Sequence, residues 1–246
     1  MTIGHRHIST REMNILDFVR KLTQGAFLIP SFQREFVWDP EDIIKLWDSI
    51  YRFYPVGSIL YWKTDISLHI HRKLGGWILP EDDRGVSRGE EERVYILDGQ
   101  QRATSLLVSL LGRQTGIRGR SAFDGSLYFD AATATFFFAK AFERRRREVD
   151  ERFLIPLGDL LESHSAFRAS IDDRAGNDQA VRDNLLQLSR VFTDYNLSFI
   201  CIRGFDIPAV REIFERINQE GKGLNSMDLM IARTFRNYEY MVEDDL

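Results

Sequence analysis

The residues best suited to chemistry form one short stretch, Asp98-Gly99-Gln100-Gln101-Arg102, which follows an apolar run and precedes an apolar helical pattern. A strand that feeds a helix through a glycine turn presents backbone N–H groups at the helix start. These groups and the helix dipole favour an anion, typically phosphate. Gly99 has no side chain, so a ligand can approach the backbone closely there. The sequence therefore predicts a phosphate site in this stretch, called the 98–102 corner below.

The side chains of the 98–102 corner add to this prediction. The planar fork of Arg102 suits phosphate oxygens. Asp98 suits a water or Mg²⁺, since this ion prefers one or two carboxylates together with the phosphates of the substrate. Gln100 and Gln101 are suited to positioning a water. The same residues also fit a simpler structure, with Asp98 as an N-cap, a turn glycine and solvent-exposed polar side chains. No P-loop motif is present, which excludes that route to nucleotide binding.

A second stretch, residues 29–38, mixes aromatic and charged side chains. In an extended chain, alternate residues point to the same side. One side would then carry Phe32, Arg34, Phe36 and Trp38, and the other Gln33 and Glu35. An arginine stacked among aromatic rings suits recognition of an anion or a base. The alternative is that Arg34 packs over a tryptophan at the rim of the core.

A third stretch covers residues 214–224 at the end of a predicted helix. The expected buried stripe of this helix consists of Val210, Ile213, Phe214 and Ile217. Arg216 and Asn218 fall off the stripe, which predicts a polar pair directed at a cleft. An ordinary helix end, with Asn218 near the C-cap and a glycine loop after it, fits the same residues.

Two histidine pairs, His5 with His7 and His69 with His71, have the spacing that places both rings on one face of a strand. A metal site needs a third ligand, and nothing in the sequence supplies one. We expect both pairs to be surface residues. The single cysteine, Cys201, excludes an internal disulfide.

Composition narrows the class of protein. The chain has 246 residues, of which 43% are hydrophobic and 28% charged, as in a globular protein of one large or two small domains. The longest apolar runs are too short to span a membrane, and the start lacks a signal-peptide pattern, so we expect a cytoplasmic protein. A net charge of −4 argues mildly against strong non-specific DNA binding. The arginines of residues 144–147 are flanked by acids, which indicates a solvated helix face.

Hydrophobic periodicity and turn residues predict the elements that position these stretches. The expected strands are 27–30, 58–62, 94–97, a hairpin of 127–129 with 136–138, 153–155 and a central strand at 197–202. The expected helices are 15–22, one from Pro40 that ends before Pro55, 103–111, 159–163, 181–195, one from Asp206 and a last one from Ser226. Residues 80–92 and 168–179 are expected to be polar loops. Strands and helices without regular βαβ spacing indicate the α+β class.

Together, the three stretches resemble the N-terminal domain of the GmrSD-type modification-dependent restriction proteins. The matching motifs are Ile-Pro-x-Phe-Gln-Arg-x-Phe-x-Trp at 29–38, Leu-Asp-Gly-Gln-Gln-Arg at 97–102, and Phe-x-Arg-Ile-Asn at 214–218 with Gly221 and Leu224. The Asp-Gly-Gln-Gln-Arg box is the hallmark of that family. The resemblance extends from about residue 27 to about residue 232, and the three motifs occur in the family's order.

The resemblance implies an α+β fold similar to ParB and sulfiredoxin, with a mixed sheet, surrounding helices and a phosphate-binding Gly-x-x-Arg element. Gly99 and Arg102 match that element. Residues 1–205 would form this domain, and residues 206–246 a C-terminal helical segment packed on it. Members of the family are associated with binding and hydrolysis of nucleoside triphosphates and with defence against phage that carry modified DNA.

The resemblance also implies roles for individual residues. Asp98, Gln101 and Arg102 would be catalytic, and Asp98 would hold Mg²⁺. The residues expected to contact the nucleotide are Gln33, Arg34, Gly99, Gln100, Thr104, Arg216 and Asn218. The expected function is that of a regulatory nucleotidase in a restriction system. A non-catalytic module that senses DNA or nucleotide is the alternative.

Full-length relatives usually carry a C-terminal HNH-type nuclease domain. This chain has no histidine beyond His164, so we do not expect DNA cleavage by these residues. A separate nuclease subunit or a C-terminal nuclease domain is the expected partner. Modified DNA is a further partner to consider, and an oligomer is compatible with the sequence.

Overall fold

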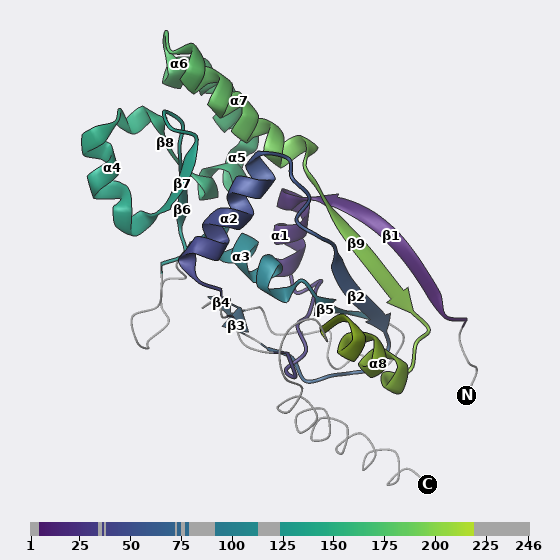
Figure 1. Cartoon of the computed structure of the whole chain (residues 1–246). Coiled ribbons are helices and arrows are strands. Elements are labelled where there is room, and N and C mark those ends of the chain that lie inside the picture. Colours follow the sequence, from purple (N-terminus) through teal and green to yellow (C-terminus); the bar gives the residue numbers. More distant parts are fainter. Residues whose placement is uncertain are drawn as a thin grey trace, which may run out of the picture.

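The computed structural model in Figure 1 describes residues 5–33, 36, 38–71, 73–74, 77–78, 92–112 and 124–218. Its fold is mixed α+β, as predicted, and consists of a four-stranded sheet, a three-stranded sheet, a two-stranded ribbon and helices packed around them. Within these described ranges, no helix is long and apolar enough to cross a membrane.

The strands are β1 (His7–Asn14), β2 (Ile59–Thr64), β3 (Lys73–Leu74), β4 (Trp77–Ile78), β5 (Arg93–Asp98), β6 (Leu127–Asp130), β7 (Thr135–Phe138), β8 (Leu154–Pro156) and β9 (Asn196–Arg203). The α-helices are α1 (Ile15–Thr23), α2 (Pro40–Tyr51), α3 (Gln100–Leu111), α4 (Phe142–Glu148), α5 (Leu157–Ala169), α6 (Ile171–Ala175), α7 (Gln179–Asp194) and α8 (Ile207–Asn218). Two short 3₁₀ turns, η2 (Ala139–Ala141) and η3 (Glu151–Phe153), connect elements around the smaller sheet.

The larger sheet has the strand order β1-β9-β2-β5. β2 and β9 run parallel, while β1 pairs with β9 and β5 pairs with β2 in antiparallel fashion. β9 is therefore an internal strand, as the sequence predicted. Because β5 runs opposite to β2, its carboxyl end lies at the same sheet edge as the start of β2, with Asp98 opposite Leu60. The 98–102 corner lies at this edge.

Both faces of β2, an internal strand of the larger sheet, are covered. In β2, Ile59 and Tyr61 join the larger core cluster with α1, α2, α3 and α7, whereas Leu60 and Trp62 join a smaller cluster on the opposite face. This alternation follows from the two-residue period of a strand. A strand buried on both faces shows a continuous apolar run, which explains the sequence of β2.

The smaller sheet, with the order β7-β6-β8, packs against α2 through aromatic side chains. The predicted hairpin is confirmed as β6 and β7. Tyr51 of α2 lies 5.0 Å from Phe129, and Trp47 lies 6.0 Å from Phe136 and 5.9 Å from Phe192 of α7, measured between ring centroids. These contacts join the smaller sheet, α2 and α7 into the larger core cluster.

The predicted start of α2 is also confirmed. Pro40 occupies the first turn, and Asp39 and Asp42 form a reciprocal capping box. One predicted loop was wrong, and one strand was missed. The polar segment 168–179 is largely helical, because Phe167, Ile171 and Ala175 recur every four residues and are buried. β1 was not predicted, because as an edge strand it lacks a regular apolar alternation.

The stretch at 29–38 does not alternate as predicted. Ser31 and Phe32 lie in a turn, and the amide of Gln33 donates to the carbonyl of Pro30 at 3.1 Å. The ring of Phe32 packs in the smaller cluster, whereas Phe36 and Trp38 pack against the larger one. The turn separates these aromatic side chains onto different sides. Residues 79–91 and 219–246, with the predicted loop and last helix, lie outside the described residues.

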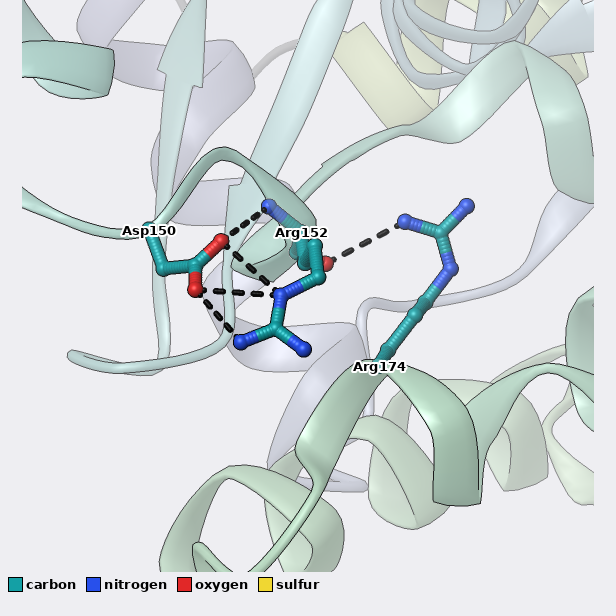
Figure 2. A network of polar contacts seen from close by, with 3 residues as sticks. All are labelled: Asp150, Arg152 and Arg174. Atoms are coloured by element: carbon teal, nitrogen blue, oxygen red, sulfur yellow. Dashed lines mark hydrogen bonds and ion pairs between the residues drawn. The ribbon is translucent and has the colours of Figure 1, made fainter.

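The arginines at 144–147 lie on α4, and most of this helix is exposed, as predicted. Arg145 is the exception, because its Nη1 lies 3.4 Å from Oδ2 of Asp130, which is fully buried. A neighbouring pair is solvent-exposed: Arg152 pairs with Asp150, and Arg174 donates to the Arg152 carbonyl at 3.2 Å (Figure 2).

Candidate functional site

The 98–102 corner has the predicted backbone. β5 ends at Asp98, α3 begins at Gln100, and Gly99 between them is the N-cap with a φ of 87°. Residues with a side chain rarely adopt this left-handed conformation, so the corner requires glycine. The N-cap is thus Gly99 rather than Asp98, which corrects the simpler alternative stated for this stretch.

Arg102 is anchored to a distant loop. Its Nη1 donates to the carbonyl of Val56 at 2.9 Å, and its Nη2 donates to Oδ2 of Asp98 at 3.2 Å. The side chain of Arg102 is 17% exposed and that of Asp98 is 40% exposed. The guanidinium is therefore mostly enclosed and oriented, while its carboxylate partner faces solvent.

Two glycines make room for this guanidinium. A Cβ on Gly57, which has a φ of 81°, would lie 2.7 Å from Nη1 of Arg102. A Cβ on Gly99 would lie 3.3 Å from Nη2 and 3.0 Å from Cγ1 of Ile59. The guanidinium thus packs against the backbone of two glycine turns, one before β2 and one before α3.

The first turns of α3 are more buried than an ordinary solvent-facing helix start. Gln100 and Gln101 are both buried, and Thr104 is 1% exposed. Within the described residues, Oγ1 of Thr104 has no hydrogen-bond partner. A buried hydroxyl without a partner is uncommon and calls for a water or a ligand in reach. The alternative of solvent-exposed polar side chains at the corner therefore does not hold for Gln100 and Gln101.

Gln33 lies beside the strand that carries the corner. Its Nε2 donates to the carbonyl of Ile96, and its own carbonyl lies 2.8 Å from Nε2 of His71. Upstream in the chain, Leu28 exchanges backbone hydrogen bonds of 2.8 Å with Val94 and Ile96. The structure therefore brings the first and second motifs together along β5.

The third motif lies on α8, which contacts β5 and packs against Phe32 through Phe214, at 5.6 Å between ring centroids. Arg216 is exposed and pairs with Glu212 on the same helix at 2.5 Å. No hydrogen bond or ion pair among the described residues links Arg216 to the corner. Asn218 ends α8, and its side chain lies outside the described residues, as does Arg34.

A pocket that the sequence did not predict adjoins the corner. Its volume is about 470 Å³. The residues that line it are Phe53, Pro55, Val56, Gly57, Ser58, Asp194, Tyr195, Asn196, Leu197 and Ser198. Val56 and Gly57 belong both to this wall and to the surroundings of Arg102. The signal in the sequence was the Pro55-Val56-Gly57 turn directly before a strand.

The donor set at the corner fits only one kind of metal binding. Among the described residues, no group of three His, Cys, Asp or Glu side chains could hold a metal ion by itself. Asp98 offers a single carboxylate that is partly exposed. A single carboxylate suits Mg²⁺ that is bound mainly by phosphate oxygens. It does not suit a metal ion held by protein ligands alone. His69 is exposed as expected, whereas His71 is half-buried beside Gln33.

The family model described as GmrSD restriction endonuclease, N-terminal domain, matches residues 15–235. The chain belongs to this family. The match includes all three motifs and the whole 98–102 corner, and it confirms the resemblance seen in the sequence. This GmrSD N-terminal domain is accordingly a component of a restriction system.

The GmrSD N-terminal domain is also similar to an uncharacterized protein of Methanocaldococcus jannaschii. The two are 32% identical over 110 residues, which covers 39% of this chain and 17% of the relative. The chain therefore spans about a sixth of the length of this curated relative.

Proposed function

We propose that this GmrSD N-terminal domain binds and hydrolyses a nucleoside triphosphate, with the phosphates at the 98–102 corner. The observation that carries the proposal is the oriented guanidinium of Arg102 at the start of α3, held by Val56 and Asp98 between two glycine turns. A fixed arginine beside a helix N-terminus is suited to stabilising phosphate charge without reorganisation.

Arg102 has donors to spare for this role. A guanidinium carries five N–H groups, and two of these bind Val56 and Asp98 among the described residues. The remaining donors would bind phosphate oxygens. Gly99 would let the phosphates approach the backbone.

Asp98 and the glutamines complete the proposed site. Asp98 would hold Mg²⁺ that the phosphates also bind, and this ion would supply neutralisation of phosphate charge. Gln101 would orient the attacking water, and Gln100, Thr104 and Gln33 would contact the nucleotide.

α8 and the restriction system complete the proposal. Arg34 and Asn218 would also contact the nucleotide. Arg216 would do so after leaving its exposed ion pair with Glu212. Hydrolysis would regulate a nuclease of the HNH type, in a separate subunit or a C-terminal domain, that acts on modified DNA in the cytoplasm.

The test is phosphate release by the purified chain with each Mg-NTP. We expect Asp98→Ala and Arg102→Ala to lower kcat/KM by about 100-fold, the cost of removing one fixed charge-stabilising group. Arg152→Ala is the matched control, because it also removes an arginine that pairs with an aspartate, away from the corner (Figure 2). We expect this control to retain wild-type rates.

Equal phosphate release by the wild type and all three variants would overturn the proposal. Nucleotide binding that depends on Arg102 but occurs without phosphate release would instead favour the alternative, a non-catalytic sensor of nucleotide or DNA.

A further inference from the structure

We infer that the pocket beside the corner, lined by Phe53, residues 55–58 and residues 194–198, binds the nucleoside part of the nucleotide. This inference rests on the proposed function, because it takes the phosphates to lie at Arg102. It adds a second subsite that none of the three sequence motifs contains. The position, size and chemistry of the pocket support this assignment.

The pocket lies next to the guanidinium of Arg102. The carbonyl of Val56 accepts a hydrogen bond from Nη1 of Arg102 at 2.9 Å, and Val56 also lines the pocket. Gly57 is the next lining residue, and a Cβ there would lie 2.7 Å from the same Nη1. Only the backbone of a glycine turn thus separates the guanidinium from the pocket. A nucleotide with its phosphates on Arg102 would reach the pocket with its sugar and base.

Phe53 gives the pocket an aromatic surface. Its φ is 58°, a conformation that is strained for an aromatic residue, and it remains 37% exposed. Strain of this kind persists where the surroundings enforce it and is frequent at ligand sites. The amide of Phe53 donates to Ile50 at 3.0 Å, and the hydroxyl of Tyr195 donates to Tyr54 at 2.8 Å. These bonds hold the backbone of the loop, and the ring of Phe53 lies 5.8 Å from that of Tyr195, measured between centroids, with the guanidinium of Arg190 6.0 Å from its centroid.

Polar side chains of the 194–198 segment also line the pocket. At the start of β9, Tyr195 and Leu197 are buried, so the alternating residues Asp194, Asn196 and Ser198 face outward at the pocket. Hydrogen bonds to Thr193 and Arg190 keep the pKa of Asp194 below its usual value, so the carboxylate is ionised and accepts only. In the described part of the chain, the side chains of Asn196 and Ser198 form no hydrogen bonds.

An exposed aromatic ring together with hydrogen-bond acceptors and donors is the chemistry that recognises a base and a ribose. Every base has a π-face and can stack on an aromatic ring. Polar side chains bind ribose hydroxyls and base edges. The volume of about 470 Å³ lies within the range of small-molecule sites. The nucleoside is the ligand that meets the size, the chemistry and the position next to Arg102.

The experiment compares two ligands on the whole chain. Dissociation constants are measured by calorimetry for each NTP and for inorganic tripolyphosphate, which has the phosphates but no nucleoside. The variant is Phe53→Asn, because asparagine tolerates the left-handed backbone and removes only the ring. We expect it to weaken binding of at least one NTP by about ten-fold, as loss of one stacking partner does, and to leave tripolyphosphate binding unchanged.

Two further variants separate this inference from the proposed function. Tyr54→Asn removes an exposed ring one residue away that does not line the pocket, and it should change neither constant. Arg102→Ala should weaken both ligands. If Phe53→Asn leaves NTP binding unchanged, or weakens both ligands equally, the pocket inference is overturned while the proposed function stands. If the wild type binds neither ligand, both are overturned.

Discussion

Gly57 and Arg102 are mutually dependent: a Cβ at residue 57 would lie 2.7 Å from Nη1 of the arginine. The arginine occupies the space that the glycine leaves open, and the next carbonyl upstream, that of Val56, holds it there. The conformation of the loop before β2 therefore sets the orientation of the side chain at the start of α3. This relationship leads to the first of four predictions.

Gly57→Ala should both strain the loop and displace Arg102. A side chain at a φ of 81° costs about 1–2 kcal/mol, and the contact with Nη1 adds to this cost. Gly176→Ala is the matched control, since Gly176 also has a positive φ but nothing lies within 4 Å of its Cβ position. In urea unfolding we expect Gly57→Ala to lose more stability than Gly176→Ala, and to weaken tripolyphosphate binding. Equal losses would contradict the proposed contact.

Thr104→Val tests whether the buried hydroxyl serves a ligand. Its Oγ1 has no partner within the described residues, so the isosteric valine should change the free energy of unfolding by less than about 0.5 kcal/mol or stabilise the fold. Binding of Mg-NTP should weaken by about ten-fold if the hydroxyl contacts phosphate. Ser105→Ala, which removes a hydroxyl bonded to the Gln101 carbonyl at 2.8 Å, should leave binding unchanged. Unchanged binding in Thr104→Val would exclude a direct contact.

Arg145→Ala should destabilise the smaller sheet strongly. Asp130 is fully buried, and the arginine is its charged partner, although the amides of Ala132 and Thr133 also donate to it. Loss of one partner of a buried ion pair costs about 3 kcal/mol. Arg152→Ala breaks an exposed pair and should cost less than about 1 kcal/mol. Chemical denaturation of both variants measures the difference, and similar losses would show that Arg145 contributes no more than a surface pair.

Glu92 should contribute an acid-dependent part of the stability. Burial alone would raise its pKa, but Lys63 and Arg203 lower it by more, so the folded-state pKa lies below the ordinary value. A depressed pKa stabilises the fold above the unfolded-state pKa of about 4.3, and this contribution is lost as the pH falls through the folded-state pKa. Glu92→Gln should therefore be less stable than wild type by about 1 kcal/mol at pH 7, with the difference vanishing in acid.

Urea unfolding at a series of pH values from about 7 to about 3, a range that includes the carboxyl pKa values, measures the stability difference between wild type and Glu92→Gln. Glu151→Gln is the control, because this exposed side chain forms no ion pair among the described residues. A constant difference between wild type and Glu92→Gln across the range would show that Glu92 acts without its charge.

Helices with a marked apolar stripe were predictable from the sequence, because their signal is local. Periodicity and caps such as Asp39 and Gly112 predicted α1, α2, α3 and α7, although α3 and α7 begin a few residues earlier than expected, at Gln100 and Gln179. α6 was missed because only two of its residues, Ile171 and Ala175, are buried. Their spacing becomes meaningful only once Phe167 precedes them on the same face.

At residues 29–38, the alternation in the sequence did not predict the side-chain directions, because tertiary contacts decide them. This alternation is typical of a strand, but Phe32 packs in the smaller cluster and Trp38 packs against the larger one, with a turn between them. A preference for an extended chain is weak, and burial of two large rings in separate places outweighs it. Gln33 nevertheless came to lie at β5, through its bond to the Ile96 carbonyl.

The amino-acid order alone determined the family, the α+β class and the turn at Gly99, since each of these depends on neighbours along the chain. Tertiary structure decided where the guanidinium of Arg102 points and that Phe53, residues 55–58 and residues 194–198 line a pocket next to it. The physical reason is that both depend on the pairing of β2 with β5 and with β9. That pairing joins segments far apart in the chain, and no local pattern encodes their register.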